Sequence, residues 1–151
     1  MKNLLFAVSL MWSIMACQKT EELAPAPASP TGNPTNIANP SQTFDATGQK
    51  LLSQGTFMGS GRYNASGSVK LYEKDGKRTL LFENFKVDNG PDLRLYLSED
   101  KVASNFVEVS SKLNSGAFFV EVPATANLQK QKFVLIWCKA FTVLFADAEL
   151  K

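Results

Sequence analysis

An alternating stretch with a two-residue turn at its centre decides the fold: VKLYEKDGKRTLLF, from Val69 to Phe82. A type I′ turn needs positive φ at both central residues, a conformation that Asp75-Gly76 adopts readily, so this dipeptide between two apolar-patterned runs predicts a β-hairpin. Counting outward from the turn pairs Lys74 with Lys77 and ends with Val69 opposite Phe82. One buried and one solvated face are typical of an antiparallel sheet. The predicted buried face consists of Val69, Leu71, Leu80 and Phe82, with the opposite charges of Glu73 and Arg78 paired near the tip.

Further short apolar runs predict strands at residues 55–58, 93–98, 118–122, 133–138 and 141–146. Turn signals rich in Gly, Asn and Pro separate them, and no stretch after the first 17 residues has sustained helical periodicity. Short strands at near-regular spacing predict an all-β fold, an antiparallel β-sandwich or a partly open barrel. Residues 43–151 are enough for one such domain and too few for two.

The first residues have the features of a targeting segment. Lys2 precedes an apolar run from Leu4 to Met15, which is too short to cross a membrane as a helix and typical of a secretory signal. The run ends in IMAC, residues 14–17, which resembles the bacterial lipobox, so residues 1–16 are predicted to be a lipoprotein signal peptide and Cys17 to be acylated. We therefore expect a lipid-anchored protein of the bacterial cell envelope, at the outer membrane, facing the periplasm or the cell surface.

Residues 17–42 are predicted to be the acylated cysteine and a tether. Five prolines among Ala, Ser, Thr and Asn leave this segment little apolar surface to bury, which favours an extended chain. At about 3.1 Å per residue it could reach roughly 75 Å from the bilayer. Removal of Lys2 from the 16 basic residues leaves 15 against 14 acidic ones, and this near-neutral balance gives no reason to expect a nucleic-acid partner.

The residue inventory narrows the chemistry. The chain has no histidine, which removes the usual zinc and blue-copper sites and every histidine-based nucleophilic mechanism, and we predict no metal site. No pair of carboxylates is placed for acid–base work, so we expect no classical enzymatic activity from the domain by itself. Asp92, which follows Gly90-Pro91, is interpreted as a turn aspartate that bonds its own backbone, with a ligand-binding role as the alternative.

If Cys17 is acylated, Cys138 is the one thiol left in the chain. Alternation along 133–138 predicts that Cys138 shares a face with Val134 and Ile136, while Trp137 points the other way. A free cysteine in such an apolar strand is often a packing residue. The chemical alternatives are a bare thiolate, a single thiolate ligand to a haem and a mixed disulfide with another chain.

Five segments in order resemble the electron-transfer DM-thirteen (Skeletor-type) domain family: GTF at 55–57, SGSV at 66–69, LFENF at 81–85, NGPDLRLYLS at 89–98 and VLIWCKAF at 134–141. The resemblance implies an extracytoplasmic β-sandwich in which Cys138 acts in electron transfer, as a bare thiol or as a ligand to a prosthetic group such as haem. Many members have a histidine near the position of Tyr63 and a glycine near that of Ala146. Without that histidine, Tyr63 or Met58 would have to replace it as a haem ligand, so the bare thiol is the better match.

Two functions therefore stand as expectations. In the first, a lipid-anchored module passes electrons to or from an unknown redox protein through the thiol of Cys138. In the second, a surface module binds a carbohydrate or protein ligand through its loops and uses no redox chemistry.

Overall fold

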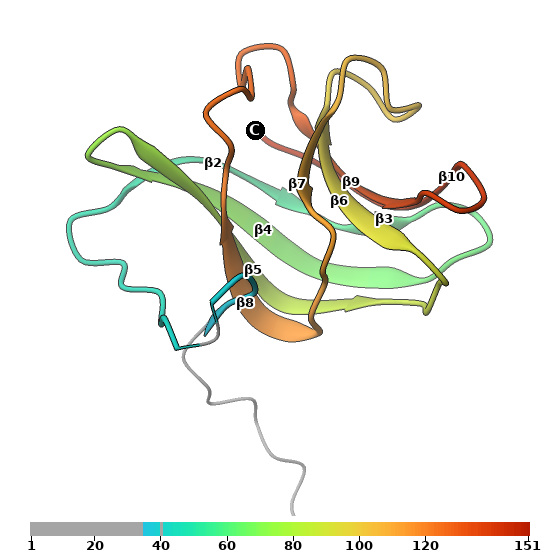
Figure 1. The fold of residues 1–151 in the computed structure, drawn as a ribbon, viewed down its shortest axis with the longest axis horizontal. Helices are drawn as coiled ribbons and strands as arrows, with labels where there is room; N and C mark the ends of the chain where they lie inside the picture. The colour runs from blue at the N-terminus through green and yellow to red at the C-terminus, as the bar shows by residue number, and fades with distance from the viewer. Residues whose placement is uncertain (1–34, 40) are drawn as a thin grey trace, which may run out of the picture.

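The computed structural model describes residues 35–39 and 41–151. Every regular element among these residues is a β-strand, and two five-stranded sheets form the layers of a sandwich (Figure 1). In spatial order, sheet A contains β1 (Thr35–Asn36), β8 (Gly116–Glu121), β5 (Lys77–Val87), β4 (Ala65–Lys74) and β2 (Lys50–Thr56). Sheet B contains β3 (Met58–Gly59), β10 (Val143–Glu149), β9 (Phe133–Cys138), β6 (Leu93–Ser98) and β7 (Val107–Ser110). The predicted antiparallel β-sandwich is confirmed, and its two sheets do not close into a barrel.

The N-terminal predictions fall largely outside this description. The predicted signal peptide, Cys17 and the first part of the predicted tether, to residue 34, lie outside the described residues. The later part of that tether belongs to the fold, because β1 pairs in parallel with β8 and Ile37 is buried in the core. Ile37 is the one large apolar residue between Pro34 and Pro40, and its burial explains why the fold includes residues that precede the predicted boundary at 43.

The central hairpin has the predicted geometry. Asp75 and Gly76 have φ values of 52° and 74°, as a type I′ turn requires. The register of β4 with β5 runs from Lys74 opposite Lys77 to Val69 opposite Phe82, as counted from the turn. Near the tip, Arg78 Nε lies 3.3 Å from a carboxylate oxygen of Glu73, and the predicted apolar face is buried in all four positions: Val69, Leu71, Leu80 and Phe82.

The core lies between the two sheets and is rich in phenyl rings. Phe82 and Phe118, on neighbouring strands β5 and β8, stack with centroids 4.4 Å apart, and Phe85 meets both of them edge-on. All three side chains are fully buried. Each contributes about 1.5–3 kcal/mol of burial free energy, so this group anchors sheet A against the inner face of sheet B.

The observed strand boundaries agree with the predicted ones for some strands and differ for others. The predicted strands 93–98 and 133–138 coincide with β6 and β9, whereas 118–122 and 141–146 are shifted relative to β8 and β10. The predicted strand 55–58 is two strands, because Phe57 turns into the core between β2 and β3 and its chain passes from sheet A to sheet B. The sequence reading missed β7, a four-residue edge strand of half-buried residues with weak alternation.

A loop covers part of the outer face of sheet B. Lys101, in the connection between β6 and β7, places its ammonium 2.8 Å from Asp147 of β10 and 5.9 Å from the ring centre of Phe133. Leu135, the cross-strand neighbour of Asp147, is fully buried although it points away from the core between the sheets. No helix in the described parts of the chain is long and apolar enough to span a bilayer.

Candidate functional site

Cys138 is the last residue of β9 and lies on the inner face of sheet B. Its neighbours across the sheet are Leu93, the first residue of β6, and Val143, the first residue of β10. The side chain is fully buried and belongs to the same core cluster as Val134 and Ile136, which confirms the predicted alternation along the strand. Cys138 is a free thiol, and it ends the core at the edge where the β5–β6 connection crosses between the sheets.

A bulge in β10 shapes this end of the core. The register of β9 with β10 shifts between Leu144 and Ala146, which leaves Phe145 as the extra residue. Phe145 is turned into the core with 2% of its surface exposed, and Tyr63 stacks on it at 3.6 Å between centroids and 10° between planes. The β3–β4 loop is tied to the bulge by a 2.9 Å hydrogen bond from the Ser60 amide to the Phe145 carbonyl.

The β5–β6 connection closes over the same place. A Cβ at Gly90 would lie 2.9 Å from Phe145 Cζ and 2.7 Å from a methyl carbon of Leu93, so only glycine permits this approach without displacement. One residue beyond Cys138, the Lys139 amide donates a 2.9 Å hydrogen bond to the Asp92 carbonyl. The thiol therefore lies beneath packed side chains and a backbone connection.

The packing does not fit a haem at Cys138. The thiol is fully buried, and Tyr63 presents its ring face to Phe145 rather than a free edge to an open cavity. Met58, the other substitute ligand considered, is opposite Asp147 on the outer face of sheet B and is 61% exposed. These residues are not brought together around a slot for a prosthetic group. The described residues also contain no group of three or more acidic or cysteine side chains suited to a metal ion.

The Asp92 carboxylate bonds a neighbouring side chain rather than its own backbone, and its predicted alternative role in ligand binding stays a prediction. This carboxylate accepts a 2.5 Å hydrogen bond from Nε of Arg94, and Nη1 of Arg94 donates a 3.0 Å bond to Glu108 of β7. The bond to Asp92, followed by that to Glu108, raises the pKa of the Arg94 guanidinium. Asp92 thus positions an arginine on the outer face of sheet B, next to the strand that carries Cys138.

The outer face also carries an aromatic row that the sequence analysis did not single out. Tyr96 of β6 stacks on Phe106 at 4.2 Å and 21°, and its ring centre lies 6.5 Å from that of Trp137 on β9. Trp137 is the cross-strand neighbour of Arg94. Alternation alone places Tyr96 and Trp137 on the outer face, but their proximity depends on the register between β6 and β9.

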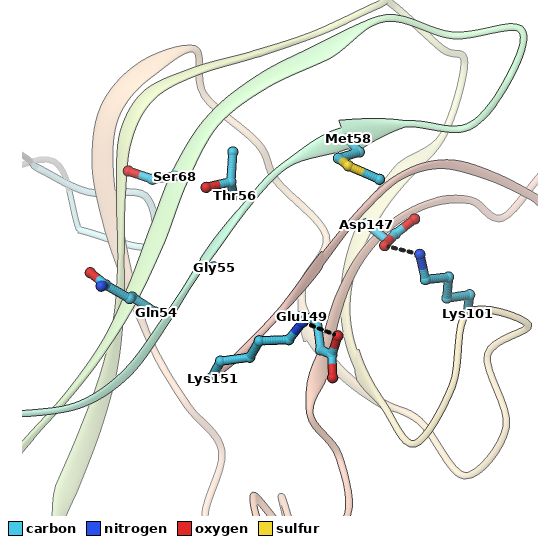
Figure 2. A pocket seen from close by; sticks show the side chains of 9 residues that line it. All are labelled: Gln54, Gly55, Thr56, Met58, Ser68, Lys101, Asp147, Glu149 and Lys151. Atoms are coloured by element: carbon cyan, nitrogen blue, oxygen red, sulfur yellow. Dashed lines mark ion pairs between the residues drawn. The ribbon is translucent and has the colours of Figure 1, made fainter.

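A polar pocket lies where β2 meets the end of the chain. Its volume is about 570 Å³, and Figure 2 shows two ion pairs at its wall, Lys101 with Asp147 and Lys151 with Glu149. The remaining lining residues are Gln54, Gly55, Thr56, Met58 and Ser68. Gln54 and Lys151 exchange two backbone hydrogen bonds of 2.9 Å, which fix this wall. Cys138 does not line the pocket.

Comparison with known proteins rests on one match. No curated protein and no solved structure matches the chain. The sequence profile of the family described as "Electron transfer DM13" matches residues 56–150. This range contains strands β3 to β10, among them β9, which carries Cys138. The chain therefore belongs to the DM13 electron-transfer family.

Proposed function

We propose that this protein is a lipid-anchored, extracytoplasmic electron-transfer module whose redox group is the thiol of Cys138. The observation that supports this most strongly is the family match across residues 56–150. Cys138 is the free cysteine of the described domain and lies at one end of the core, opposite Leu93, which packs against the Gly90 connection. A thiol in that position is exposed by local opening of the Gly90 connection without unfolding of the sheets.

Burial sets the expected behaviour of this thiol. Because Cys138 is fully buried, we expect a thiol reagent to modify it in the folded protein more slowly than in denaturant. Modification should still be much faster than global unfolding, which can be timed separately by a jump into denaturant. A thiol that reacts only as fast as the whole domain unfolds would contradict the redox role.

A second measurement addresses the role directly. The Cys138 thiol should transfer one electron to a one-electron acceptor dye and release its proton to water, which leaves a thiyl radical and the reduced dye. Cys138→Ala should lose that transfer while it keeps a cooperative unfolding transition. Alanine is the suitable variant because serine would bury a hydroxyl without a partner. An absorption spectrum of the purified protein tests the haem alternative, since a Soret band would contradict the bare-thiol proposal.

The proposed anchor is tested separately. The lipobox-like sequence at 14–17 supports acylation of Cys17 after removal of residues 1–16, and the composition of the following segment supports a tether to the outer membrane. The Cys17→Ala variant should lose membrane fractionation, whereas wild-type protein should pellet with membranes. A variant that still pellets would contradict the anchor and leave the redox experiments unaffected.

A non-redox binding module is the second candidate, and one observation favours it. The thiol is buried, while the pocket in Figure 2 opens to the surface and offers charged, hydroxyl and amide groups suited to a polar ligand. If this candidate holds, a carbohydrate or peptide ligand should bind with equal affinity to wild-type protein and Cys138→Ala. The same ligand should bind more weakly to Ser68→Ala or Gln54→Ala.

A further inference from the structure

Because the Cys138 thiol is buried, electrons must enter and leave the closed domain through other side chains. Cys138 has no exposed surface, so a partner cannot touch it while the fold is closed. Its chain neighbour Trp137 points to the opposite side of the same strand and is partly exposed on the outer face of sheet B. Trp137 is one of 2 tryptophans in the chain, and the other is Trp12 in the predicted signal peptide. The mature domain would therefore present a single indole.

The indole has an oxidisable neighbour at short range. Tyr96 lies with its ring centre 6.5 Å from that of Trp137, and the two planes differ by 27°. Tyr96 also stacks on Phe106, which is itself 45% exposed, and Tyr96 is buried. Indole and phenol are the aromatic side chains that lose an electron most easily, whereas the phenyl ring of phenylalanine does not take part at comparable potentials.

Charged side chains lie on the same face as the aromatic pair. Asp92 and Glu108 both form ion pairs with Arg94, and Arg94 is the cross-strand neighbour of Trp137. Burial raises the pKa of the Tyr96 phenol, and the Glu108 carboxylate raises it further. The phenol is therefore protonated at neutral pH and must release a proton when it loses an electron.

We propose that Trp137 and Tyr96 form the site at which this domain exchanges electrons with a partner, on the outer face of sheet B. The inference rests on the proposed electron-transfer function but does not require Cys138 to be the redox group. A one-electron metal centre of a partner protein removes one electron from the Trp137 indole and leaves an indole cation radical. Tyr96 then returns one electron to the indole and releases its phenolic proton to water, which leaves a neutral tyrosyl radical. A one-electron donor restores the phenol, which takes back one proton.

The test is transient absorption after flash photo-oxidation of the mature protein by a ruthenium polypyridyl sensitiser with a sacrificial acceptor. In wild-type protein we expect an indole radical that converts to a tyrosyl radical. Tyr96→Phe should lose the conversion and leave a long-lived indole radical. Trp137→Phe should lose the indole signal, and a cooperative unfolding transition will show that each variant is folded.

The chain provides two matched controls. Tyr63 stacks on Phe145, and the ring centre of Tyr72, on sheet A, lies 5.1 Å from that of Phe44. Neither tyrosine belongs to the aromatic row of Tyr96, Phe106 and Trp137. Tyr63→Phe and Tyr72→Phe should both keep the conversion. Conversion that persists in Tyr96→Phe, or that is lost in either control, would overturn the proposal.

One further variant separates this proposal from the proposed function. Cys138→Ala should keep the conversion of indole radical to tyrosyl radical, because the pair lies on the other face of the strand. Loss of dye reduction in Cys138→Ala with the conversion intact supports both proposals. Unchanged dye reduction in Cys138→Ala would contradict only the proposed role of the thiol. Loss of the radical conversion in that variant would show that Cys138 takes part in electron transfer between Trp137 and Tyr96, and would contradict the proposed exchange site.

Discussion

Replacement of Gly90 by alanine is a direct test of the packing over Cys138. The added methyl would lie 2.9 Å from Phe145 Cζ and 2.7 Å from a methyl carbon of Leu93, whereas carbon atoms pack best at about 3.5–4.0 Å. Leu93 is only partly buried and can rotate away. Phe145 cannot, because it is 2% exposed and stacked against Tyr63. The clash must therefore displace either the phenyl ring or the connection.

Overpacking of this kind costs about 1–3 kcal/mol, and alanine regains about 0.4–1 kcal/mol by restricting the unfolded chain. We expect Gly90→Ala to lower the free energy of unfolding by about 1–2 kcal/mol, which moves a urea midpoint down by roughly 1 M at a typical slope for a domain of this size. Equilibrium unfolding in urea, followed by the fluorescence of Trp137, measures the shift. The slope should be unchanged, because the substitution does not alter the surface exposed on unfolding.

The partner of the clash can be identified by a double-mutant cycle. In a Phe145→Leu background, Gly90→Ala should cost at least about 0.5 kcal/mol less than in wild-type protein, because the ring that it strikes is gone. Gly61→Ala is a useful contrast: Gly61 has φ of +54° and no atom within 4 Å of an added Cβ, so its cost is backbone strain and should be independent of Phe145. Equal costs of Gly90→Ala in the two backgrounds would refute the packing described here.

Three further predictions concern the hairpin, the loop and the alkaline limit. Asp75→Val places a β-branched residue at φ of 52° and should lower stability by about 1–2 kcal/mol in thermal unfolding, whereas Asp75→Asn should be nearly neutral. Lys101→Ala leaves the Asp147 carboxylate, whose side chain is 10% exposed, without its cation. Because the lysine side chain is itself 49% exposed, we expect the free energy of unfolding to fall by only about 1–2 kcal/mol, and a double-mutant cycle with Asp147→Asn should show the coupling. The pKa of the Tyr96 phenol is raised above its ordinary value of 10.0, so the stability that Tyr96 contributes is complete below that pH and is lost as pH rises through the folded-state pKa. In urea unfolding between about pH 8 and about 11, the free energy of unfolding of Tyr96→Phe should therefore fall less steeply with pH than that of wild-type protein.

Local chemistry accounts for the parts of the fold that were predicted well. The Asp75-Gly76 turn fixed the register of β4 with β5 because a two-residue loop leaves one way to pair the flanking residues. The limits of β6 and β9 coincide with their apolar runs, since both strands are bounded by turn residues and buried on the inner face. The short edge strands β1, β3 and β7 could not be predicted in this way, because their residues carry weak alternation and are ordered by pairing with distant strands.

The candidate site likewise has features that local sequence predicted and features that it did not. Alternation along β9 correctly placed Cys138 on the inner face and Trp137 on the outer one, because side-chain direction in a strand is a local property. The stack of Tyr63 on Phe145 joins residues far apart in the chain through a bulge that has no signal in the sequence. The bond of Asp92 to Arg94 was also missed, because turn propensity favours the aspartate's own backbone as the partner.

The sequence by itself determined an all-β fold, a strand that ends in a cysteine and the absence of histidine from the chain, because strand pattern, turn chemistry and residue content are local or compositional. Only the tertiary structure decided that the thiol is fully buried at the end of the core where Gly90 packs against Leu93 and Phe145, while Tyr96 lies beside Trp137 on the other face. Burial and proximity depend on which strands become neighbours and in what register. Those are long-range choices, set by the packing of two sheets against each other rather than by any one segment.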